Sequence, residues 1–219
     1  MKRVPDWSLY LVTDRRLASP RAIEAVVAAA VRGGVTAVQL REKECSTREF
    51  VELARKLKEI LAPLAVPLIV NDRTDVALAA GADGVHAGQS DMDCRDLRRV
   101  LGPGAIIGLS VETLEQAERA AALPVDYLGV GPIFSTPTKP DAAPAWGIER
   151  LAELRRRTRQ VLVAIGGIHA GNAGRVMEAG ADGIAVVSAI CAAADPEAAA
   201  RELRARTRRG GRVLAPPDE

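Results

Sequence analysis

The chain has 219 residues, of which 48% are hydrophobic and only 3% are aromatic, so one medium-sized domain with an aliphatic core is expected. Its 30 Lys and Arg residues nearly balance 28 Asp and Glu, for a formal net charge of +2, and this excludes a nucleic-acid or membrane partner recognised by bulk charge. No apolar run approaches the roughly 20 residues of a membrane span and the N-terminus lacks a signal-peptide pattern, so a cytoplasmic protein is expected.

Strand-like and helical segments alternate along the chain, which is typical of parallel βα units. The strand-like runs lie at 9–12, 37–40, 67–70, 84–87, 106–109, 127–131, 161–165 and 183–187. Eight such runs predict the α/β class and a single (β/α)8 TIM barrel, which we expect over residues 1–209. A doubly wound sheet is the alternative, but no G-x-G-x-x-G motif follows the first strand. Residues 210–219, rich in proline and charge, are expected to form a flexible tail.

Local signals predict where some of the helices begin and end. Ser19-Pro20 predicts a helix with Ser19 as the N-cap and proline at the first helical position, and Ser46–Glu49 has the spacing of a capping box. The segment Ala80–Val85 recurs half a chain later as Ala179–Ile184, and each copy contains a glycine suited to a helix C-terminus. This repetition favours a barrel of repeated units.

Polar residues follow the end of the second strand, at the face where barrel enzymes carry their chemistry. Gln39, Arg41 and Lys43 alternate with a period of two, so they point to one side if the strand geometry continues. Two cations and an amide there suit a diphosphate and a heterocycle. The alternative is an ordinary charged loop in which Arg41 and Lys43 pair with Glu42 and Glu44.

Acidic residues follow the third and fourth strands. Asn71-Asp72 come directly after an apolar run, and Asp91 follows the next such run after Gln89 and Ser90. Mg²⁺ prefers one or two carboxylates and takes other oxygen ligands from water and substrate phosphates. The pattern therefore predicts a site for a magnesium diphosphate, whereas the alternative makes Asp72 a helix N-cap and Asp91 a turn residue.

The later strand ends carry further phosphate-binding signals. Residues 135–139 place three hydroxyls and a lysine in a short loop, while Gly166-Gly167 and Val187-Ser188 follow the seventh and eighth strands, the usual phosphate position in barrels. Close packing alone is the alternative explanation for the two glycines. His86, within the fourth strand, is interpreted as a core or rim histidine.

Taken in order, the motifs resemble those of the thiamine phosphate synthase family over nearly the whole chain. They are VQLREK at 38–43, VNDR at 70–73, GVHAGQSD at 84–91, GLS at 108–110, GVGPIFSTPTK at 129–139, AIGGI at 164–168 and VVSAI at 186–190. The resemblance implies an Mg²⁺-dependent transferase that joins 4-amino-2-methyl-5-hydroxymethylpyrimidine diphosphate to a thiazole phosphate carboxylate by a dissociative carbocation mechanism. The products are thiamine phosphate, diphosphate and CO2.

The resemblance also implies roles for individual residues, matched motif by motif. For the pyrimidine diphosphate they are Gln39, Leu40, Arg41, Glu42, Lys43, Asn71, Ser110 and Lys139. For the thiazole phosphate they are Thr136, Pro137, Thr138, Gly167, Val187 and Ser188. Asp72 and Asp91 are expected to hold Mg²⁺. Arg41, Lys43, Ser110 and Lys139 are expected to be catalytic by stabilising charge, and no protein nucleophile is expected.

Two other functions are compatible with this fold. One is a thiazole phosphate tautomerase, although Glu112 stands where many relatives, including the tautomerases, carry a histidine. The other is a non-catalytic protein that binds thiazole phosphate. The expected partners are small molecules, with no nucleic acid and no membrane, and a homo-oligomer is compatible with the sequence.

Overall fold

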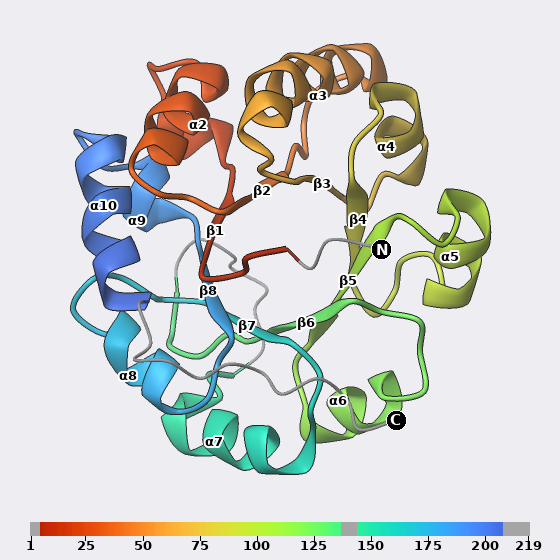
Figure 1. Cartoon of the computed structure of the whole chain (residues 1–219), viewed down its shortest axis with the longest axis vertical. Helices are drawn as coiled ribbons and strands as arrows, with labels where there is room; N and C mark the ends of the chain where they lie inside the picture. The colour runs from red at the N-terminus through yellow and green to blue at the C-terminus, as the bar shows by residue number, and fades with distance from the viewer. Residues whose placement is uncertain (1–4, 137–143, 208–219) are drawn as a thin grey trace.

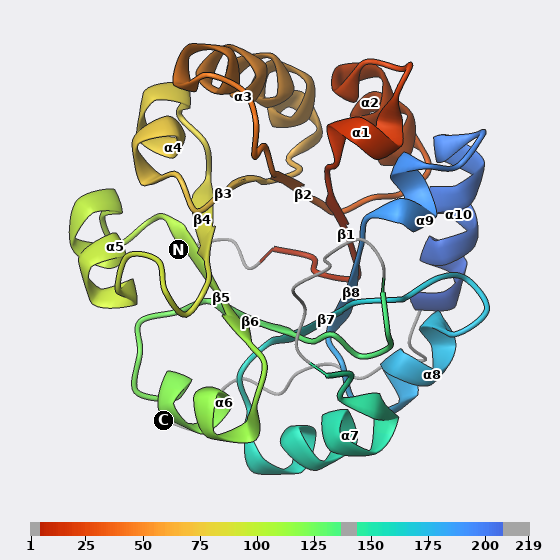
Figure 2. The ribbon, with the colours of Figure 1, turned by 180° about the vertical axis from the view of Figure 1, so that it is seen from behind.

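The computed structural model describes residues 5–136 and 144–207. Eight parallel strands pair in sequence order and the last pairs with the first, which closes the barrel. Helices surround the strands on all sides (Figures 1 and 2). The predicted (β/α)8 barrel is confirmed, while the tail expected at 210–219 lies outside the described residues.

The strands nearly coincide with the predicted runs. They are β1 (Leu9–Val12), β2 (Ala37–Leu40), β3 (Leu68–Asn71), β4 (Gly84–Ala87), β5 (Ile106–Val111), β6 (Tyr127–Val130), β7 (Leu162–Ile165) and β8 (Gly183–Val186). The helices are α1 (Arg15–Ala18), α2 (Ile23–Arg32), α3 (Thr47–Leu61), η1 (Ala62–Leu64), α4 (Thr74–Ala80), α5 (Cys94–Leu101), α6 (Leu114–Ala120), α7 (Gly147–Arg157), α8 (Ala173–Glu178), α9 (Ser188–Cys191) and α10 (Pro196–Thr207).

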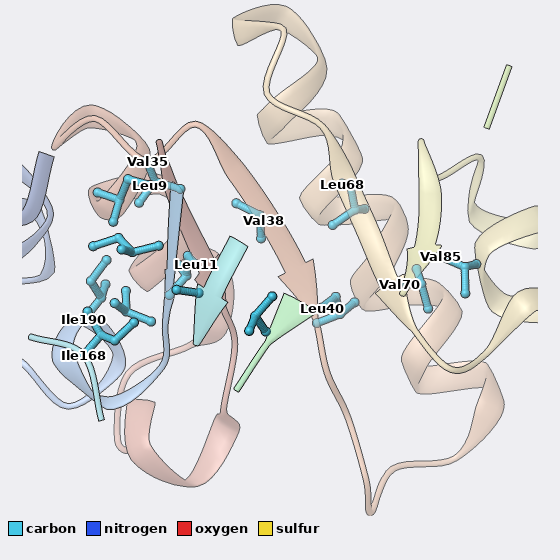
Figure 3. Close-up of a cluster of buried hydrophobic side chains, with 14 of the residues drawn as sticks. Leu9, Leu11, Val35, Val38, Leu40, Leu68, Val70, Val85, Ile168 and Ile190 are labelled. Carbon is cyan, nitrogen blue, oxygen red and sulfur yellow. The ribbon is translucent and has the colours of Figure 1, made fainter. Parts of the chain in front are cut away.

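Side chains alternate between the two faces of each strand, because successive residues of a β-strand point in opposite directions. One set forms a large apolar layer between strands and helices, and Figure 3 shows its members on the first four strands. The other set fills the barrel interior and includes Tyr10, Ile69, Tyr127 and Val163. Trp7 precedes β1 and packs on Tyr127 with ring centroids 4.2 Å apart, so it closes the N-terminal end of the interior.

An aspartate repeated around the barrel fastens neighbouring strands at their N-terminal ends. Asp83, Asp126 and Asp182 each accept a hydrogen bond from the strand before, at 2.8 Å in every case. The donors are the backbone N–H groups of Leu68, Ile107 and Leu162. Each carboxylate also pairs with a cation of the helix that leads into that earlier strand: Lys58 of α3 at 2.6 Å, Arg98 of α5 at 2.9 Å and Arg155 of α7 at 2.9 Å. The segments repeated in the sequence, Ala80–Val85 and Ala179–Ile184, therefore each contain an aspartate that attaches one strand to the strand before it.

Replacing Asp182 with alanine is expected to lower the free energy of unfolding by about 2 to 3 kcal/mol, because the Leu162 N–H and the Arg155 guanidinium both lose a partly buried acceptor. Turnover should persist, since Asp182 lies at the end of the barrel opposite the predicted site. Urea unfolding measures the change. In the control Asp96→Ala, which removes only an exposed pair with Arg99, the loss should stay below about 1 kcal/mol; equal losses in both variants would contradict the prediction.

The helix signals are confirmed in one case and wrong in the other. Ser46 caps α3 through a complete capping box with Glu49, as predicted. Ser19 is instead the C-cap of the short helix α1, and α2 begins only at Ile23 with Ala22 as its N-cap. The extended backbone of Ser19 and Ala22 keeps this stretch out of a helix, in accord with the bias that proline imposes on the residue before it.

Candidate active site

A cavity of about 650 Å³ opens at the C-terminal ends of the strands. It brings together most of the residues expected in the site: Gln39, Arg41, Lys43, Asn71, Asp72, Asp91, Ser110, Thr136, Gly167, Val187 and Ser188. These residues lie at or beyond the C-terminal ends of seven of the strands, β2 to β8, so the parallel barrel makes neighbours of positions far apart in the chain. Glu112, at the position linked to the tautomerase alternative, also lines this cavity.

Two expected members of the pyrimidine diphosphate site do not line the cavity with their side chains. Leu40 is fully buried in the outer apolar layer (Figure 3). The Glu42 carboxylate accepts a hydrogen bond of 3.0 Å from Nε of Arg15 and its side chain is only 4% exposed. Both follow from strand alternation, because Gln39 and Arg41 take the inward positions. Pro137, Thr138 and Lys139 lie outside the described residues.

The two cations at the end of β2 belong to the cavity. Lys43 Nζ lies 3.0 Å from Oδ2 of Asp72, and the Arg41 backbone N–H donates to Oγ1 of Thr13 at 3.0 Å, which ties β2 to the chain after β1. The alternative of a locally paired loop is wrong. Glu42 pairs with Arg15 and Glu44 pairs with Arg16, so the acidic neighbours are engaged by helix α1, which follows β1.

The two aspartates are held in different ways. Asp72 has a φ of 61°, in the left-handed region that non-glycine residues seldom adopt, and its N–H donates to the His86 carbonyl at 2.9 Å. It is not the N-cap of α4, since that position is Arg73. Asp91 Oδ2 accepts from the Gly88 N–H at 2.7 Å, so the turn interpretation is confirmed, yet Asp91 also lines the cavity.

The floor of the cavity contains aromatic residues that the sequence reasoning missed. Tyr10 and Tyr127 are each 1% exposed and line the cavity from β1 and β6. Their signal in the sequence is their rarity, because they are the only two tyrosines of the chain and both fall at inward positions of predicted strands. His86 is 8% exposed and hydrogen-bonded between Tyr127 and Ser110, as expected of a core histidine.

Burial lowers the pKa of His86 to about 4, while the charge of Asp91 opposes this shift. An unfolded histidine has a pKa near 6.5, so the unfolded chain binds the proton first as the pH falls. We expect this residue to add up to about 3 kcal/mol to the free energy of unfolding at neutral pH, a contribution lost between pH 6.5 and 4. Urea unfolding at pH 7 and pH 4.5 tests this. The loss on acidification should be smaller in His86→Gln, and an equal loss would contradict the assignment.

Comparison with known proteins gives the family. The model of the thiamine monophosphate synthase family matches residues 9–190. The chain belongs to this family. A thiamine-phosphate synthase of Albidiferax ferrireducens is 62% identical over 90% of both chains, and one of Syntrophomonas wolfei subsp. wolfei is 53% identical over 91% of this chain and 95% of that one.

Solved structures agree with this membership of the thiamine monophosphate synthase family. A thiamine phosphate pyrophosphorylase from Pyrococcus furiosus superposes with a TM-score of 0.85 at 40% identity, covering 93% of this chain and 96% of that chain. A 3-hexulose-6-phosphate synthase, at 19% identity and a TM-score of 0.66, shares the fold alone. In the part of the chain that the structure describes, no helix combines the length and apolar character needed to cross a membrane.

Proposed function

We propose that this transferase joins 4-amino-2-methyl-5-hydroxymethylpyrimidine diphosphate to thiazole phosphate carboxylate, with release of diphosphate and CO2, to give thiamine phosphate. One observation carries the proposal: a single cavity at the C-terminal face contains the cations Arg41 and Lys43 together with the carboxylates Asp72 and Asp91. This combination suits a diphosphate and its metal ion. Two relatives that are 53% and 62% identical are thiamine-phosphate synthases, and this supports the same reaction.

The residues present fit a magnesium ion. Asp72 and Asp91 line the cavity, and Asn71 adds an amide oxygen beside them. Two carboxylates suit Mg²⁺, because this ion takes its other ligands from water and substrate phosphates. Asp72 and Asp91 would hold Mg²⁺, and bound there it would offset negative charge on the departing diphosphate.

The residues of the chain stabilise charge in the reaction. The C–O bond between the pyrimidine methylene and diphosphate breaks first, and the thiazole nitrogen then forms the new C–N bond. The bond between the thiazole ring and its carboxylate breaks to release CO2, and the electron pair left on the ring carbon takes a proton. Arg41 and Lys43 neutralise charge on the leaving diphosphate, and because they are already in place, no reorganisation is needed when the bond breaks. The buried floor of Tyr10 and Tyr127 keeps bulk water away from the cationic carbon.

The thiazole phosphate is assigned to the opposite wall of the cavity, after β6, β7 and β8. Gly166 and Gly167 have φ values of 101° and 64°, so the backbone there follows a path that other residues seldom adopt. An added Cβ on Gly167 would lie 2.7 Å from the Ser135 carbonyl oxygen, so close packing also favours glycine at this position. Thr136 and Ser188 supply hydroxyl donors beside these glycines and Val187.

A coupled assay tests the proposed function. The protein is incubated with both substrates and Mg²⁺, and diphosphate and thiamine phosphate are followed together. We expect them to appear in equal amounts. Isomerisation of a thiazole phosphate without release of diphosphate would identify a tautomerase instead, and binding of the thiazole phosphate without any product would identify a binding protein. Either result would overturn the proposal.

A further inference from the structure

Five polar side chains form a continuous hydrogen-bonded chain across the barrel interior. Gln39 Nε2 lies 3.1 Å from the Tyr10 hydroxyl, which lies 2.9 Å from the Tyr127 hydroxyl. The Tyr127 hydroxyl lies 2.9 Å from Nδ1 of His86, and Nε2 of His86 lies 2.8 Å from Oγ of Ser110. We call these five residues the polar relay. Its ends, Gln39 and Ser110, are two of the residues assigned to the pyrimidine.

The relay occupies a closely packed space. Tyr10, Tyr127, His86 and Gln39 are all buried, so bulk water does not replace a missing partner. Two glycines make room for the rings. A Cβ added to Gly108 would lie 2.2 Å from Cζ of Tyr127, and one added to Gly129 would lie 2.8 Å from Cε1 of His86. The glycines of β5 and β6 therefore admit the two rings at these positions.

The relay has one direction. The amide nitrogen of Gln39 only donates, so the Tyr10 hydroxyl accepts from it. Within the described residues the proton of Tyr10 then has Tyr127 as its one acceptor, and an unpaired buried donor is costly. Tyr127 in turn donates to Nδ1 of His86. A neutral imidazole carries one N–H, which is left on Nε2 and donates to Ser110.

This direction determines what the two ends offer to a ligand. One N–H of the Gln39 amide donates to Tyr10, and the amide oxygen, which accepts no bond within the relay, remains as an acceptor in the cavity wall. Oγ of Ser110 accepts from His86, so its own proton remains as a donor. An aminopyrimidine is the complement of this pair, because its amino group donates and its ring nitrogen accepts. In an oxopyrimidine the neighbouring N–H donates and the oxygen accepts, which reverses the pattern.

We propose that Tyr10, Tyr127 and His86 are positioning residues that set the hydrogen-bond polarity of Gln39 and Ser110, and that this polarity selects an aminopyrimidine over an oxopyrimidine. The inference rests on the proposed function, since it concerns the pyrimidine substrate of the same cavity. It assigns no proton transfer to the relay. The relay fixes the direction of its hydrogen bonds and holds His86 in one tautomer.

The first test is spectroscopic and needs no turnover. Nitrogen NMR of the full chain with labelled histidine reports which ring nitrogen carries the proton. The chain has two histidines, so the signals that remain in His169→Gln are those of His86. We expect a pyridine-type Nδ1 and a pyrrole-type Nε2 for His86 at neutral pH. The opposite tautomer would mean that the relay runs from Ser110 to Gln39, and would overturn the inference.

The second test measures discrimination. Calorimetry with Mg²⁺ gives the Kd of the aminopyrimidine diphosphate and of its 4-oxo analogue, for the parent and for Tyr127→Phe and Tyr10→Phe. Each variant keeps the ring and removes one hydroxyl of the relay. We expect the preference for the amino compound to fall about tenfold, the worth of one hydrogen bond, while the Kd of thiazole phosphate stays unchanged.

Trp7→Phe is the matched control, because Trp7 packs on the Tyr127 ring without being part of the relay. It should keep the preference of the parent. An unchanged preference in both tyrosine variants, or an equal fall in Trp7→Phe, would overturn the inference. Failure of the proposed function is separate: in that case the parent makes no thiamine phosphate in the coupled assay, whatever the tautomer of His86.

Discussion

Asp91→Asn and Asp72→Asn are each expected to lower kcat/KM by about a hundredfold, roughly 3 kcal/mol of transition-state stabilisation. Each change removes one negative charge from the proposed magnesium site, and Asp72→Asn also weakens the ion pair with Lys43, while the backbone at both positions is kept. An asparagine oxygen at position 91 can still accept from the Gly88 N–H, and asparagine tolerates the left-handed backbone at position 72. Steady-state kinetics at several Mg²⁺ concentrations measures the effect.

A shift of the half-saturating Mg²⁺ concentration to higher values should accompany the loss in both variants, because a weaker ion site fills later. Asp75→Asn is the matched control. Asp75 lies three residues from Asp72 and pairs with Arg73, but does not line the cavity. Its kcat/KM should stay within about twofold of the parent, the range of an exposed pair. Normal turnover by both Asp72→Asn and Asp91→Asn would show that the metal assignment is wrong.

Gly183→Ala is expected to lower the free energy of unfolding by about 3 kcal/mol or more, at the upper end of overpacking effects. A Cβ at this position would lie 1.7 Å from the Trp7 carbonyl oxygen. That atom belongs to the backbone beside β1, so it has no rotamer by which to move away. Relief requires β1 and β8 to separate or Trp7 to leave its place against Tyr127. Urea unfolding followed by circular dichroism measures the loss.

Gly174→Ala provides the opposite control within the same part of the chain. A Cβ there meets nothing within 4 Å, and Gly174 lies inside α8. Alanine is the better helix former by about 0.5 to 1 kcal/mol, so this variant should be slightly more stable than the parent. If Gly183→Ala unfolds at the same urea concentration as the parent, the proposed contact between β8 and the Trp7 backbone does not limit stability.

The barrel and its polar rim are evident in the sequence because both follow from short-range patterns. Runs such as AVQL and PLIV end at polar residues, and parallel strands bring such ends to one face. Strand alternation also predicts that Gln39 and Arg41 share a side, and the cavity contains both. The motif match added Leu40 and Glu42 to the site, whereas the same alternation turns their side chains outward, where the structure has them.

Contacts between distant segments were not evident in the sequence. The ion pairs of Glu42 and Glu44 with Arg15 and Arg16 join the loop after β2 to helix α1, and no local spacing predicts them. The local sequence signal also misplaces the start of α2, for a similar reason. Proline after serine is a good local signal for a helix start, but here Ser19 ends α1 and Arg21 bonds to the carbonyl of Cys191, far along the chain.

The sequence by itself determined the order of the strands, the alternation of their faces and the kinds of charge at their ends, because these depend on neighbouring residues and on the fixed geometry of a strand. Only the tertiary structure decided which side chains meet across the barrel. Tyr10, Tyr127 and His86 come from β1, β6 and β4, and they touch because Gly108 and Gly129 leave room for their rings in a closed interior. That packing depends on all of the strands at once.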